Sequence, residues 1–93
     1  MLENTWTVKA FASYAEEYCY GWVHILGAPD GRTLVCAALH ETGGGDVCCN
    51  EVLSSERSEA NIFSAVHRVT AAIKLERHLA EECISHYPSI EVD

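Results

Sequence analysis

Residues 54–88 carry an apolar stripe with a helical period, and this stripe constrains the fold more than any other feature of the sequence. At 100° per residue, the apolar side chains gather on one side of a helix: Ile62, Ala65, Val69, Ala72, Ile73, Ala80, Cys83 and Tyr87. Polar side chains fall opposite: His67, Lys74, His78, Glu81 and Ser85. Ser54, Ser55 and Ser58 can cap the N-terminus, and Pro88 can close the C-terminus. The pattern predicts one long amphipathic helix.

Glu76 interrupts this stripe near its middle. A carboxylate that is buried without a partner is costly. We therefore expect Glu76 to be paired, to reach past the sheet edge, to mark a local adjustment of the helix, or to lie beside a pocket.

Four segments before residue 54 have the composition of β-strands: residues 6–14, 18–26, 32–40 and 47–52. Pro29-Asp30-Gly31 and Gly43-Gly44-Gly45-Asp46 supply turn residues between them. Ninety-three residues, 48% of them hydrophobic, suffice for one domain. The sequence therefore predicts a single α+β domain over residues 1–93. It contains an antiparallel β-sheet of three to four strands followed by one long C-terminal amphipathic helix packed on one face.

A single helix leaves the second face of such a sheet without a cover. In the second strand, alternation places Cys19, Val23 and Ile25 on one face. The other face receives the aromatic and imidazole side chains: Tyr18, Tyr20, Trp22 and His24. If the helix covers the aliphatic face, this row points outward and indicates a partner or homodimer surface. Alternatively, the N-terminal segment and loops cover the rings, or the faces are reversed.

The chain is strongly acidic, with 14 Asp and Glu against six Lys and Arg and a formal charge of −8. Direct binding to nucleic acid is unfavourable for such a chain, because phosphate contacts need a surplus of cations. A basic protein surface is the natural complement, although acidity also serves solubility alone. We expect a cytoplasmic protein without membrane contact, since the sequence has no signal-peptide start and no run of eighteen apolar residues.

The five cysteines are odd in number, lie within apolar runs and include the adjacent pair Cys48-Cys49. We interpret them as reduced thiols that behave as small buried hydrophobic side chains. A zinc-ligand set can be drawn from His40, Cys48, Cys49, Cys83 and His86, but no C-x-x-C pair supports it. We therefore predict neither a metal nor a cofactor.

His24 and Cys36 can face each other across the Pro29-Asp30-Gly31 turn. In three features the chain resembles the bacterial ribosomal-processing cysteine protease family. These are the twelve-residue offset between the histidine and the cysteine, the stretch Val35-Cys36-Ala37, and Tyr87-Pro88 near the C-terminus. The resemblance implies Cys36 as nucleophile and His24 as its base. The chain has Val23 and Thr33 where that family has Gly and Asp, and a strand cysteine opposite a histidine is the alternative interpretation.

The order of three strands and a helix resembles the opening half of the ribonuclease H fold. Tyr20-Gly21-Trp22-Val23 is similar to the second strand of that fold, and Arg57-Ser58-Glu59 is similar to the start of its first helix. The resemblance implies Glu59 and Asp93 as metal-binding carboxylates. Ser13 stands where the family has its first aspartate, so we expect no nuclease activity.

In size and charge the chain resembles the small acidic inhibitors that bacteriophages make against host defence, anti-CRISPR proteins among them. We predict a non-enzymatic acidic protein that docks on a basic or nucleic-acid-binding surface of a partner protein and inhibits or modulates it. The alternatives are a thiol enzyme using Cys36 and His24, and a homodimer formed through the sheet face. The candidate binding residues are Glu16, Glu17, Tyr20, Trp22, Glu81 and Glu82.

Overall fold

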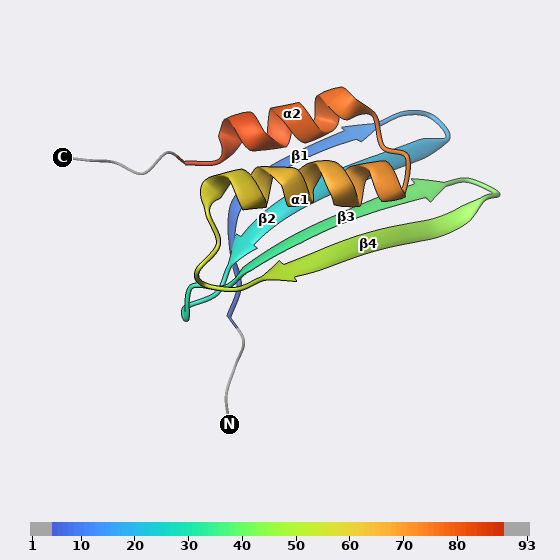
Figure 1. Ribbon diagram of the computed structural model, residues 1–93. Coiled ribbons are helices and arrows are strands. Elements are labelled where there is room, and N and C mark those ends of the chain that lie inside the picture. The colour runs from blue at the N-terminus through green and yellow to red at the C-terminus, as the bar shows by residue number, and fades with distance from the viewer. Residues whose placement is uncertain (1–4, 89–93) are drawn as a thin grey trace.

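The computed structural model describes residues 5–88, which form a sheet followed by two helices (Figure 1). The strands are β1 (Thr7–Ala15), β2 (Cys19–Gly27), β3 (Thr33–Glu41) and β4 (Gly45–Leu53), and the helices are α1 (Glu59–Ala72) and α2 (Arg77–His86). Both helices lie on the same face of the sheet, with α2 against β1 and β2, and α1 mainly against β3 and β4 (Figure 1). The predicted α+β class and the four strands are confirmed.

The strands follow one another through the sheet in the order β1-β2-β3-β4, and every neighbouring pair is antiparallel. The turn between β2 and β3 is the one that the Pro29-Asp30-Gly31 sequence predicts. Gly31 has a φ of 95° and donates its N–H to the Ala28 carbonyl at 3.0 Å, while the Asp30 carboxylate accepts from the Arg32 N–H at 3.0 Å. The β1–β2 and β3–β4 turns consequently lie together at the other end of the sheet (Figure 1).

Strand β1 contains a register shift that reverses its alternation. Val8 pairs with Leu26, whereas Ala10 pairs with Ile25. The extra residue, Lys9, moves Val8 to the face opposite Ala10. Simple alternation along residues 6–14 would put Val8 and Ala10 on one face, because a period of two cannot reveal a bulge.

The prediction of one long helix is wrong, because the helical segment breaks after Ile73. Lys74 adopts the left-handed conformation with a φ of 64°. Its N–H donates to the Ala71 carbonyl at 3.1 Å, and the Leu75 N–H donates to the Thr70 carbonyl at 2.9 Å. These two bonds form the Schellman motif that ends many helices, here with lysine in the position where glycine is usual. The chain then turns and begins α2.

The break explains the interrupted apolar stripe. Glu76 is the N-cap of α2, with a side chain that is 65% exposed and lies 3.2 Å from the His78 ring. The carboxylate is therefore at a helix end and in water. Ala72, which the stripe placed on the apolar side, is exposed at the end of α1, and Leu79 of α2 is buried.

The core lies between the helices and one face of the sheet. Its fully buried larger members come from β2, β3 and both helices: Ile25, Ile62, Leu79, Val23, Val35, Val66, Val69, Thr33 and Cys83. Burial of each large aliphatic side chain contributes about 1.5–3 kcal/mol. Ser58, one of the serines suggested as a cap, starts α1 by exchanging two hydrogen bonds of 3.2 Å with Asn61. At Gly21 a Cβ would lie 2.6 Å from Leu75, so glycine permits the α1–α2 turn to pack on β2.

Candidate functional site: the open face of the sheet

The face of the sheet turned away from α1 and α2 carries the aromatic row predicted from alternation in β2. Tyr20, Trp22 and His24 project to this side, and Tyr20 is 48% exposed. Phe11 of β1 joins them and is 52% exposed. Within residues 5–88 both helices lie on the opposite side (Figure 1). We call this surface the open face. Tyr18 is exposed but precedes β2 rather than lying in the row.

The rings on the open face pack against one another along and across the strands. The Trp22 and His24 ring centroids are 4.4 Å apart, and the Phe11 ring meets His24 edge-on at 5.8 Å. The Tyr20 and His40 rings are 4.9 Å apart and tilted by 33°. Ring pairs of this kind add stabilisation beyond the area they bury. The row is thus held in place before any partner arrives.

The two ends of the open face differ in chemistry. Near the β2–β3 turn a cross-strand row is aliphatic: Val8, Leu26, Leu34 and Val52. Near the β1–β2 and β3–β4 turns the row contains Tyr20, His40 and Asp46. The Nδ1 of His40 contacts the Asp46 carboxylate, so the Nδ1–H of the imidazole donates to the carboxylate there.

A shallow depression of about 320 Å³ lies at the polar end of the open face. Tyr20, Trp22 and Ala38 line it together with His40 and Asp46, and Leu39, Val47 and Cys48 complete the lining. No lysine or arginine is among these residues. The depression therefore combines aromatic walls with one carboxylate.

Further carboxylates surround this end of the sheet. Glu16 and Glu17 belong to the β1–β2 turn, which is joined to the β3–β4 turn by a hydrogen bond of 2.8 Å from the Thr42 N–H to the Tyr18 carbonyl. Glu41 ends β3 beside them. The predicted residues Glu16, Glu17, Tyr20 and Trp22 thus lie at one end of the molecule.

The remaining two candidates lie elsewhere. Glu81 and Glu82 are exposed residues of α2, on the helix side of the sheet. Glu81 forms an ion pair of 3.4 Å with Arg77. The structure therefore does not bring these glutamates together with the aromatic row.

Sequence reasoning missed Phe11 and Asp46 as members of the open face. Asp46 was assigned only to a turn, and Phe11 was not singled out. The signal for both is strand register: Phe11 is opposite His24, and Asp46 is opposite His40. Register follows from turn geometry and from the bulge in β1, neither of which a single-strand pattern gives.

His24 and Cys36 are direct cross-strand partners on the open face. No hydrogen bond joins the thiol and the imidazole within the described part of the chain. Burial raises the pKa of the Cys36 thiol, with a smaller contribution from Cys48, and burial lowers the pKa of His24. A nucleophilic thiol instead requires a lowered pKa, usually from a neighbouring cation.

The cysteines are less buried than the sequence indicated. All five lie within residues 5–88 and are unbridged, but only Cys83 is buried, and Cys48 is exposed. The five residues from which a zinc set was drawn are divided between the two sides of the sheet. His40 and Cys48 line the open-face depression, whereas Cys83 lies in the core with its Sγ 3.7 Å from the Val23 carbonyl. Residues 5–88 contain no group of three ligands suited to a metal ion.

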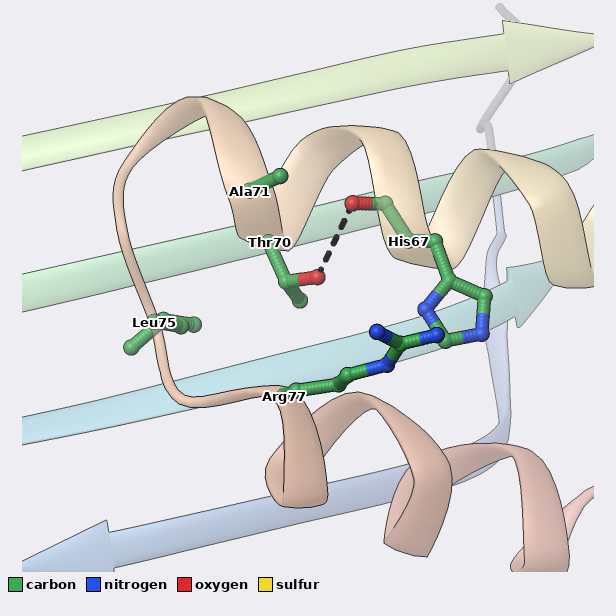
Figure 2. A pocket seen from close by; sticks show the side chains of 5 residues that line it. All are labelled: His67, Thr70, Ala71, Leu75 and Arg77. Carbon is green, nitrogen blue, oxygen red and sulfur yellow. Dashed lines mark hydrogen bonds between the residues drawn. The ribbon is translucent and has the colours of Figure 1, made fainter.

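A second depression, of about 280 Å³, lies where α1 and α2 meet (Figure 2). The side chains of His67 and Arg77 point toward one another across it, and Leu75 lies at its end (Figure 2). The Thr70 hydroxyl at this site donates within α1, to the Val66 carbonyl at 2.7 Å. The Arg77 guanidinium pairs with the exposed Glu81 carboxylate at 3.4 Å, so both this hydroxyl and this guanidinium have partners within the chain.

Glu59, matched above to the helix carboxylate of the ribonuclease H family, lies in the first turn of α1. Asp93, the other matched carboxylate, lies outside the described residues. No helix among residues 5–88 is long and apolar enough to cross a membrane. Comparisons with protein-family models, with curated proteins and with solved structures find no match to this chain.

Proposed function

We propose that this chain is a non-enzymatic binding protein that docks through the open face onto a basic surface of a partner protein and inhibits or modulates it. In kind this is the activity of the small acidic anti-defence inhibitors of bacteriophages, anti-CRISPR proteins among them. The observation that supports the proposal is the aromatic row of Tyr20, Trp22 and His24, which lies on the sheet face opposite both helices within residues 5–88 and continues into a carboxylate-rich end of the sheet.

The two halves of this surface supply different parts of the binding free energy. Tyr and Trp side chains are the most frequent anchors of protein interfaces, and truncating one typically costs about 2 kcal/mol or more. Trp22 and Tyr20 are already fixed by ring packing, so little side-chain entropy is lost on docking. Glu16 and Glu17 add negative potential that accelerates encounter with a basic surface.

The net charge favours a basic protein over a nucleic acid as the partner. Four of the six cations already contact groups of this chain: Arg32, Arg57, Arg68 and Arg77. Few cations remain to neutralise phosphates, which is the main source of nucleic-acid affinity. A partner that itself binds nucleic acid has the complementary surface, because it carries the cations that this chain lacks.

The test uses two matched double variants. One double variant combines Glu16→Gln with Glu17→Gln in the β1–β2 turn, and the other combines Glu81→Gln with Glu82→Gln in α2. Each removes two carboxylates and so changes the formal charge from −8 to −6. Wild type and both variants, together with Trp22→Ala, capture proteins from a cell lysate at low salt, and the captured partner is purified. Its association rate constant is then measured from about 50 to 500 mM NaCl.

We expect Trp22→Ala to weaken the purified complex by roughly thirtyfold, which corresponds to about 2 kcal/mol. The association rate falls with salt, and Glu16→Gln with Glu17→Gln lowers it more than the α2 pair does. A larger loss for the α2 pair would place the interface on the helix side and overturn the assignment to the open face. A salt-independent rate would remove the electrostatic part of the proposal.

The aliphatic row of the open face favours one second candidate, a homodimer. Val8 and Val52 are 49% and 55% exposed at that end, and a second copy could cover them. Two copies also bring together two chains of −8, which opposes association at low salt. Sedimentation of the wild type beside Trp22→Ala separates the candidates, since a monomer in both excludes the homodimer.

A further inference from the structure

The depression at the polar end of the open face has the chemistry of a receptor for a single organic cation. Its lining includes the rings of Tyr20 and Trp22 and the Asp46 carboxylate, whose side chain is 76% exposed. The volume of about 320 Å³ is large enough for one long side chain. We propose that this depression binds an arginine side chain of the partner, which deepens and rests on the function proposed above.

Charge disfavours an anionic occupant of the depression. An anion would approach Asp46 with Glu16 and Glu17 at the same end of the sheet, and like charges repel. A purely apolar group would cover the Asp46 carboxylate without replacing its contacts with water, which is costly. A guanidinium ion meets both requirements, because its plane lies against an aromatic ring while its N–H groups donate to a carboxylate.

The chain itself contains this arrangement at the opposite end of the sheet. The Arg32 guanidinium lies over the Trp6 ring, 5.4 Å from its centroid, and its Nε donates to the Asp30 carboxylate at 2.8 Å. The lining of the open-face depression also contains an indole and a carboxylate, from Trp22 and Asp46, and includes no lysine or arginine of this chain. The partner supplies the cation.

His40 positions the carboxylate for this role. Its Nδ1–H donates to one oxygen of Asp46, and its ring packs against Tyr20 at 4.9 Å. One carboxylate oxygen is thereby engaged, and the other remains available to accept from a guanidinium. Arginine is favoured over lysine, since the planar fork can stack and donate at once, whereas an ammonium is a compact and strongly hydrated charge.

The probe is the peptide acetyl-Gly-Arg-Gly-amide, compared with the same peptide carrying citrulline, which has the shape of arginine but no charge. Binding to ¹⁵N-labelled protein is followed by the amide shifts and by the indole N–H of Trp22. Asp46→Asn removes the carboxylate of the depression. Glu56→Gln removes one charge from the connection between β4 and α1, at the other end of the sheet, and serves as the control.

We expect the arginine peptide to shift the Trp22 indole and the neighbouring amides of β2 and β3, with an affinity about tenfold above that of the citrulline peptide. Asp46→Asn lowers the arginine affinity by about tenfold, and Glu56→Gln changes it less than twofold. Equal binding of the two peptides, or equal effects of the two variants, would overturn the receptor. If the arginine peptide does not bind but Trp22→Ala still weakens binding of the captured partner, the receptor is wrong and the docking function stands. If the peptide does not bind and Trp22→Ala leaves partner binding unchanged, the docking function is wrong as well.

Discussion

Replacing Lys74 with glycine tests the break between α1 and α2, because the substitution should raise the free energy of unfolding if the break exists and lower it if the helix is continuous. Lys74 has a φ of 64° in the Schellman turn, a conformation that costs an L-residue about 1–2 kcal/mol relative to the right-handed helix. Glycine adopts it without that cost but loses more backbone entropy on folding, by about 0.5–1 kcal/mol. The net expectation for Lys74→Gly is a gain of about 0.5–1 kcal/mol in the free energy of unfolding.

The same substitution inside a continuous helix would have the opposite effect. Glycine in a helix interior costs about 1 kcal/mol relative to a good helix former such as lysine. Urea unfolding of wild type, Lys74→Gly and Lys74→Ala measures the difference, because alanine removes the charge but keeps the left-handed strain. A higher midpoint for glycine alone, at an unchanged slope, supports the turn. A midpoint lowered by glycine and raised by alanine would refute it and restore one long helix.

Three further predictions concern packing, pH and the thiols. Gly21→Ala should lower the free energy of unfolding by about 1 kcal/mol, since the added methyl would lie 2.6 Å from a buried leucine methyl of the α1–α2 turn; an unchanged urea midpoint would contradict that packing. Because burial lowers the pKa of His24 below its ordinary value of about 6.5, the unfolded chain binds more protons there, and stability falls as pH drops below that value. The fall between pH 7.5 and 5.5 should be smaller in His24→Gln, and equal falls would count against a buried imidazole. In the native protein an alkylating reagent should modify Cys48 first and Cys83 last, because burial raises the pKa of Cys83 to about 12. Fastest modification at Cys36 would instead favour the thiol enzyme.

Strand content and the main turn could be predicted because their signals are local. The Pro29-Asp30-Gly31 turn and the alternation of β2 each depend on a few adjacent residues, and both are confirmed. The helix break could not be predicted in the same way. Neither glycine nor proline marks it, and the left-handed residue is Lys74, which is a good helix former. The one available signal was Glu76, a carboxylate that a single helix would have placed among apolar residues.

The candidate site, too, could be predicted only where the signal is local. The projection of Tyr20 and Trp22 away from the core face of β2 followed from alternation and is confirmed. The position of Asp46 beside His40 did not follow from alternation, since it depends on the register of β3 and β4. Glu81 was grouped with the aromatic residues on charge alone, and no local pattern indicates which side of the sheet a helix will cover.

The most direct test of the proposed interface is a cross-saturation experiment on deuterated, ¹⁵N-labelled protein bound to its purified, unlabelled partner. Irradiating the partner attenuates only amide signals close to the contact surface. The proposed docking predicts attenuation along β2 and β3 around Trp22, with α1 and α2 unaffected. Attenuation centred on α2 near Glu82, with the strands unaffected, would contradict it.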